Sequence, residues 1–229
     1  ESGATTTLNS GAQLTISGTL TNNGTLTLES GATLVQGSAS TLAGSGTYNV
    51  KQTITGAGST TPSGRFWYLG SPVSLASSSA YFASNAANVV KKRSESTNAW
   101  TALSSGTPEN LMVGQGYYTQ AIPASSTINF TGGLLNNGAI TINNLTRTAG
   151  QGFEGFNLVS NPCPSYLDWD AVTKSNVDAT MWYRTYDGTN MVFETYVAGA
   201  AGGVGTNVSG NTATRYIPPM QSYWVRVSQ

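Results

Sequence analysis

The sequence predicts an all-β protein in which a short β-solenoid-like repeat leads into a duplicated, jelly-roll-like β-sandwich. Three observations predict this fold class. Short alternations of apolar residues and Thr recur between glycines in the first fifty residues. Aromatic strands that end in Pro and Asn turns follow, and their motif order occurs twice. Helical character is confined to two short segments. We therefore divide the chain into residues 1–58, 59–149 and 150–229.

The repeat in residues 1–58 consists of units that begin at glycine, such as residues 24–28 and 31–35. Alternation with a period of two places Leu26 and Leu28 on one face of a strand and Thr on the other. Strands this short bury a core only by stacking on copies of themselves, which favours a solenoid. Ordinary hairpins are the alternative, because Asn23 and Gly24 also suit a tight turn.

The sandwich is predicted from three motifs that each occur twice in the chain. They are a strand that runs into a Pro turn, a polar hairpin tip, and a turn that precedes an aromatic strand. In that order the pairs are residues 66–72 with 156–162, 94–100 with 186–193, and 111–119 with 217–225. Two related halves of this kind pack sheet on sheet.

Two helices are expected in this region. Residues 171–176 follow Asp170, which is placed to cap a helix. Residues 83–90 are the weaker candidate, because Asn85 and Asn88 favour turns.

The composition excludes several classes of function. The chain has 229 residues, no His, one Cys, 10 Lys and Arg, and 10 Asp and Glu. A Ser-His-Asp triad, a His-ligated zinc and an internal disulfide are impossible. Cys163 has no basic neighbour and is interpreted as an inert buried thiol. A net charge of zero argues against nucleic-acid binding, and no apolar run is long enough for membrane insertion.

Carboxylates are the remaining candidates for acid–base or metal chemistry. Asp168 and Asp170 suit a structural Ca²⁺, which accepts oxygen ligands alone. A glycosidase pair of Asp168 and Glu154 is a further alternative. We favour structural roles for these carboxylates, and we predict no catalytic residue and no required cofactor.

Aromatic residues are the candidates for carbohydrate binding, since their rings stack on sugar faces. The four candidates are Trp100, Tyr118, Trp182 and Trp224. Packing beneath loops or between sheets is the alternative interpretation.

One segment resembles a known family. Residues 155–165, which read GFNLVSNPCPS, and the LDWD of residues 167–170 resemble a segment of large surface proteins exported by the bacterial type IX secretion system. In those proteins the segment precedes a C-terminal sorting domain, and residues 217–225 resemble its end. Cys163 stands where the family usually has Tyr, and Ser222 where it has Gly.

The resemblance implies a piece of a longer exported protein, secreted or held at the cell surface, with further domains in the same chain. We therefore expect a non-enzymatic extracellular module for display, adhesion or structural spacing. Its expected partner is a glycan or a neighbouring surface protein. A carbohydrate-binding module of a secreted polysaccharide-degrading enzyme is the alternative.

Overall fold

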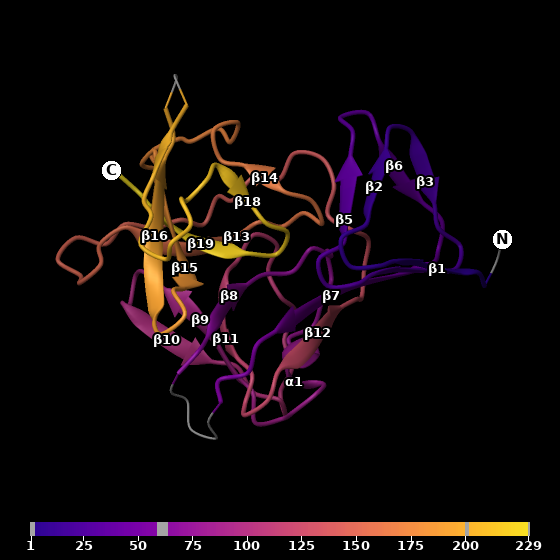
Figure 1. Ribbon diagram of the computed structural model, residues 1–229, viewed down its shortest axis with the longest axis horizontal. Helices are drawn as coiled ribbons and strands as arrows, with labels where there is room; N and C mark the ends of the chain where they lie inside the picture. Colours follow the sequence, from indigo (N-terminus) through magenta and orange to yellow (C-terminus); the bar gives the residue numbers. More distant parts are fainter. Residues whose placement is uncertain (1–2, 59–63, 200–201, 229) are drawn as a thin grey trace.

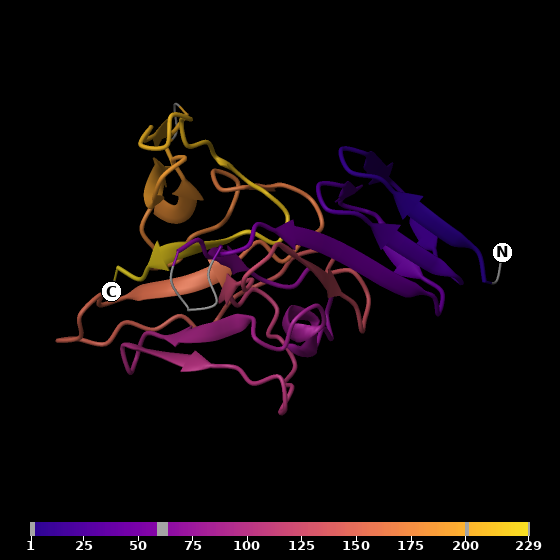
Figure 2. The ribbon, with the colours of Figure 1, turned by 60° about the horizontal axis from the view of Figure 1, so that its bottom comes forward.

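The computed structural model describes residues 3–58, 64–199 and 202–228 (Figure 1). Strands account for 41% of the described residues and helix for 2%, which confirms the all-β prediction. The N-terminal strands lie at one end of the molecule, and the C-terminal sheets lie at the other (Figure 2).

The N-terminal strands wind into a coil. Its strands are β1 (Thr5–Leu8), β2 (Gln13–Ile16), β3 (Thr19–Thr21), β4 (Thr25–Leu28), β5 (Thr33–Gln36), β6 (Thr41–Ala43) and β7 (Thr47–Ile54). β1, β4 and β7 pair in parallel, as do β2 with β5 and β3 with β6. Thr5 lies opposite Thr25 and Thr25 opposite Thr47, so each turn of the coil takes 20 or 22 residues. Each glycine-bounded unit of the sequence is therefore one side of a three-sided turn.

Apolar residues and threonines alternate along these strands, so that one kind of side chain lies inside the coil and the other on its surface. Leu26, Leu28 and Leu34 are buried inside, while most of the threonines face outward. Gly11 and Gly31 occupy the same corner of successive turns with φ of 79° and 87°, a conformation that residues with a Cβ rarely adopt. The glycine spacing of the sequence thus sets the corners.

The coil is continuous with the next part of the chain. β7 pairs antiparallel with β12 (Ser126–Phe130), so strand pairing crosses the predicted division between residues 58 and 59. One hydrophobic core runs from Leu26 in the coil through Tyr81 and Phe130 to Leu135. The short helix α1 (Ser79–Phe82) packs against β12 within this core.

The two halves that follow have the same strand order. The first contains β8 (Trp67–Leu69), β9 (Val89–Ser94), β10 (Ala99–Ala102) and β11 (Tyr117–Gln120), in the sheet order β10-β9-β11-β8. The second contains β13 (Phe156–Ser160), β15 (Thr180–Tyr186), β16 (Met191–Val197), β17 (Val204–Gly205) and β19 (Ser222–Arg226), in the order β13-β19-β15-β16-β17. β14 (Leu167–Asp168) and β18 (Tyr216–Ile217) form a separate pair.

The register of the two sheets matches residue by residue. Tyr117 lies opposite Leu69 in the first sheet, and Tyr223 lies opposite Val159 in the second. These are the positions that the two motif pairs align, so the strand pairing agrees with the predicted duplication.

Both helix predictions are wrong. Residues 171–176 form turns, because the Asp170 carboxylate contacts Arg215 and Tyr196 instead of capping a helix. Residues 83–88 are also turns, and β9 begins at Val89. The Asn88 side chain donates to the carbonyl of Tyr81 at 2.8 Å and accepts from the N–H of Ile122, which fixes the chain in a non-helical path.

Candidate functional site

The two halves meet across a pseudo-two-fold contact. The N–H of Gly70 donates to the carbonyl of Met220, and the N–H of Ser160 donates to the carbonyl of Gly114, each at 2.8 Å. Gly70 aligns with Ser160 in the duplicated motifs, and Gly114 aligns with Met220. Each half therefore hydrogen-bonds the other through equivalent backbone atoms.

An aromatic cluster fills the space between the two sheets. It contains three of the four predicted carbohydrate residues, Trp100, Tyr118 and Trp224, together with Tyr68 and Phe66. Trp100 and Trp224 meet edge to face with centroids 5.9 Å apart, and Trp100 lies 5.9 Å from Tyr118. Such pairs contribute beyond the area they bury.

Trp182 lies outside this group of rings. Its ring packs edge to face on Phe156 at 5.1 Å. The candidates thus divide into three residues of one cluster and one separate residue.

Most ring faces in the cluster are used for packing. Phe66 stacks on Tyr118 at 4.7 Å, and the guanidinium of Arg184 lies 5.0 Å from the Phe66 ring. Burial raises the pKa of the Tyr68 and Tyr118 hydroxyls. Trp100 is the most exposed of the predicted candidates, at 38%. Of these candidates it has the largest exposed fraction to offer a ligand.

Asp168 and Asp170 are brought together by one arginine. Arg215 donates to both oxygens of Asp168 at 2.6 Å and lies 3.1 Å from a carboxylate oxygen of Asp170. Hydrogen bonding from this guanidinium lowers the pKa of Asp168. Tyr196 donates its hydroxyl to Asp170 at 3.0 Å. The guanidinium occupies the position between the carboxylates where a cation would bind.

Glu154 has a partner of its own, Arg147, at 2.8 Å. The hydrogen bonds and ion pairs among described residues do not connect Glu154 with Asp168. Among all the residues that the structure describes, no three or more His, Cys, Asp or Glu side chains form a group that could hold a metal ion.

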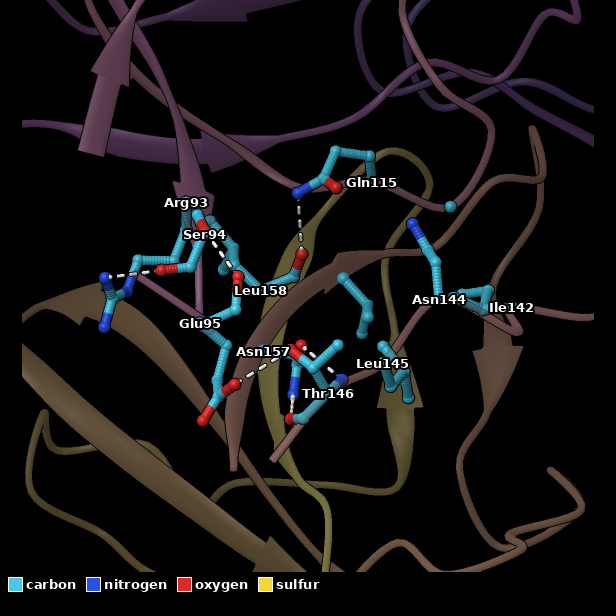
Figure 3. Close-up of a pocket in the computed structure, with 13 residues that line it drawn as sticks. Arg93, Ser94, Glu95, Gln115, Ile142, Asn144, Leu145, Thr146, Asn157 and Leu158 are labelled. Atoms are coloured by element: carbon cyan, nitrogen blue, oxygen red, sulfur yellow. Dashed lines mark hydrogen bonds between the residues drawn. The ribbon is translucent and has the colours of Figure 1, made fainter. Parts of the chain in front are cut away.

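The sequence analysis missed a buried glutamate. Glu95, in the predicted hairpin tip, is 4% exposed and lies beside a cavity of about 210 Å³ between the two halves (Figure 3). It accepts hydrogen bonds from the backbone N–H groups of Thr148 and Gly155 at 2.9 Å and from the hydroxyls of Thr146 and Thr148. Burial alone would raise its pKa, but these four donors lower it to about 2. Glu95 thus fastens the first half to the loop before β13.

Glu194 has a similar role in the second half. It is 1% exposed and accepts from the hydroxyl of Thr206 and from the N–H groups of Val208 and Ser209. Although burial opposes ionisation, the donors lower its pKa. Glu194 lies within β16, opposite Tyr183 of β15. The sequence around it does not indicate that its side chain is buried.

The remaining carboxylates of the described residues are also paired or bonded. Glu29 pairs with Lys51, Glu109 with Lys92 and Asp178 with Arg226, while Asp187 accepts backbone N–H groups of its own turn. Every carboxylate in the described part of the chain therefore has a structural partner.

A family model described as a domain of unknown function (DUF8693) matches residues 1–229. The chain belongs to this family. No curated protein and no solved structure matches it.

The match covers the coil and both halves, so the DUF8693 unit extends across both predicted divisions. This agrees with the core and strand pairing that join the coil to the first half. Among its described residues, the DUF8693 chain has no helix both long and apolar enough to cross a membrane.

Proposed function

We propose that the chain is a non-enzymatic extracellular module of a secreted cell-surface protein of the type IX kind, serving for display, adhesion or structural spacing. One observation carries the non-enzymatic part of this proposal. Every carboxylate of the described residues is held by a cation, a hydroxyl or backbone N–H groups, and histidine is absent. Acid–base catalysis needs a titratable group that is available to a substrate.

The joining of the coil and the two halves supports a spacing or display role. The coil shares a core with the first half and the halves are hydrogen-bonded to each other, so the described chain is one unit with the coil at one end (Figure 2). Its surface owes much of its polarity to neutral Thr, Ser and Asn side chains, which suit contact with the medium or with a neighbouring surface protein. The resemblance of residues 155–170 to type IX cargo supports the location.

The test is to label intact cells of the source bacterium with an antibody raised against the purified chain. Surface labelling that disappears when the export system is inactivated supports the proposal. A cytoplasmic signal released only by lysis, with no labelling of intact cells, would contradict it. A panel of hydrolase substrates gives the separate test of the non-enzymatic role, and turnover that follows the purified chain would refute that part.

Carbohydrate binding is the second candidate, and the exposure of Trp100 favours it. The stacking of the other rings on each other gives it less support than the first proposal. A glycan array tests it with the wild type, Trp100→Ala and the control Tyr166→Ala, whose ring is 58% exposed and is not among the candidates. Binding lost only in Trp100→Ala supports the candidate, whereas absence of wild-type binding or equal binding by all three proteins contradicts it.

A further inference from the structure

A second cavity lies where the hairpin of β15 and β16 meets the chain before β8. It has a volume of about 610 Å³ and shares no lining residue with the cavity beside Glu95. Its other walls are residues 55–57, which follow β7, and residues 64–66. Gly64 and Thr189 are exposed at its rim, so it opens to solvent. We call it the hairpin cleft. Its volume is in the range of small-molecule sites, about 300–1,000 Å³.

Two arginines line the hairpin cleft, and neither has an acidic partner. The guanidinium carbon of Arg65 lies 3.7 Å from the ring centroid of Tyr186. That of Arg184 lies 4.2 Å from the ring centroid of Phe193, and its Nη1 donates to the carbonyl of Met191 at 2.6 Å. The buried Nε of Arg184 has no hydrogen-bond partner in the described part of the chain. The ion pairs among described residues include neither arginine, so both guanidinium groups contact neutral groups.

The acidic residues of the hairpin do not neutralise this charge. Glu194 follows Phe193 in β16, and strand alternation directs its side chain to the other face of the sheet, where it is buried and bonded to Thr206. Asp187 lies in the hairpin turn and accepts backbone N–H groups of that turn. The lining of the cleft includes no carboxylate. In a chain with a net charge of zero, the hairpin cleft is therefore a local site of positive charge.

Uncharged groups complete the lining of the cleft. Thr55, Thr189 and Asn190 supply hydroxyl and amide groups, which hydrogen-bond to the hydroxyls of a ligand. The Tyr186 ring packs on no other aromatic ring among the described residues, so it does not belong to the aromatic cluster. Such a ring suits the apolar edge of a sugar. Guanidinium groups bind carboxylate and sulfate through paired hydrogen bonds.

We infer that the hairpin cleft binds an acidic sugar, a ring that carries hydroxyl groups and a carboxylate or sulfate. Arg65 and Arg184 bind the anionic group, and the neutral lining binds the hydroxyls. Trp100 does not line this cleft, so the site is separate from the one considered above for carbohydrate. The inference goes beyond the display or spacing role and does not depend on it.

Isothermal titration calorimetry of the purified chain is the test. The probes are a trisaccharide of galacturonic acid, a sulfated κ-carrageenan tetrasaccharide and neutral galactotriose. At least one of the two acidic saccharides is expected to bind about tenfold or more tightly than the neutral one, and salt should weaken its binding. The two acidic probes distinguish a carboxylate ligand from a sulfate ligand. A glutamate-rich peptide is the fourth probe, because it shares the charge and lacks the sugar hydroxyls.

Two variants test the site itself. Arg65→Gln is expected to raise the dissociation constant of the acidic saccharide about tenfold or more, since charged hydrogen bonds are lost. Arg93→Gln is the matched control, because it removes the same charge from a residue that lines the other cavity. Thr189→Glu places a negative charge at the exposed rim and is also expected to weaken binding. Circular dichroism establishes that the variants are folded, and Thr189→Glu serves alone if Arg65→Gln does not fold.

Several results would overturn the inference. They are absence of binding by both acidic saccharides, equal binding of galactotriose, and equal or tighter binding of the peptide. A dissociation constant that the folded cleft variants leave unchanged, or that Arg93→Gln raises as much, also overturns it. Trp100→Ala should retain the binding of the acidic saccharide. Loss of binding in Trp100→Ala but not in the cleft variants would assign the sugar to the aromatic cluster instead.

Discussion

The contact between the two halves depends on a glycine that has no room for a side chain. A Cβ added at Gly70 would lie 2.1 Å from Oγ of Ser160, 2.3 Å from its Cβ and 2.8 Å from the carbonyl oxygen of Gln115. These distances are far below van der Waals contact, and two of the atoms belong to a short, fully buried side chain. Gly70→Ala must therefore push the sheets apart at their hydrogen-bonded contact.

We expect Gly70→Ala to lower the free energy of unfolding by about 1–3 kcal/mol, the usual cost of overpacking. For a chain of this size, that corresponds to a fall in melting temperature of about 2–12 °C. Thermal and urea unfolding followed by circular dichroism measure it. Gly18→Ala is the control, because Gly18 has open space around its Cβ position, and we expect it to be neutral or to stabilise by up to about 1 kcal/mol.

A second substitution tests the cause. Ser160→Gly removes the two nearest of the atoms that the new methyl group would meet, and the carbonyl oxygen of Gln115 at 2.8 Å remains. The double variant should therefore recover part of the loss, with a coupling energy of about 0.5–3 kcal/mol. Wild-type stability of Gly70→Ala, or strict additivity of the two changes, would refute the reasoning.

Three further predictions concern the polar clusters and the aromatic cluster. Glu95→Gln should destabilise the chain by about 1–3 kcal/mol at neutral pH, since buried donors lose a charged acceptor. Because the pKa of Glu95 is lowered to about 2, its contribution is present above pH 4.5 and is lost between about pH 4.5 and 2; urea unfolding across that window should show a weaker pH dependence in the variant. Ca²⁺ should leave the melting temperature of the wild type unchanged, because Arg215 lies between Asp168 and Asp170, and a clear rise in calorimetry would reverse that assignment. Trp224→Ala should destabilise by about 3–5 kcal/mol, measured by urea unfolding, and a loss below 1 kcal/mol would show that the aromatic cluster does not hold the sheets together.

The sequence predicted the parts of the fold that depend on local pattern. Glycine spacing and alternation indicated the strands of the coil, and the repeated motif order indicated two sheets of one topology. The pairing of the coil strands could not be predicted from the spacing of the glycine-bounded units. Each strand pairs with the strand three units later in the chain, as β1 does with β4 and β2 with β5. The helix predictions failed because Asp170 and Asn88 form tertiary hydrogen bonds that local propensity does not encode.

The candidate site was harder to predict for the same reason. Glu95 lies between two serines in a polar segment, which is the usual sequence of a solvent-exposed turn, yet a loop more than fifty residues away buries it. The aromatic candidates were chosen by residue type. Type alone does not distinguish a ring that stacks on another ring from a ring that faces solvent, and only the meeting of the two sheets decided between them.

That meeting also explains why the two halves are no longer equivalent. Where the first half has Gly70 and Gly116, the second has Ser160 and Ser222, which lie opposite each other in their sheet. Each serine fills the space that a glycine leaves: Ser160 approaches Gly70, and Ser222 approaches Gly116. Two first halves would leave a gap at this contact, and two second halves would bring four serine side chains into the same space. The duplicated sheets are therefore complementary to each other and not to themselves, which fixes their pairing within one chain.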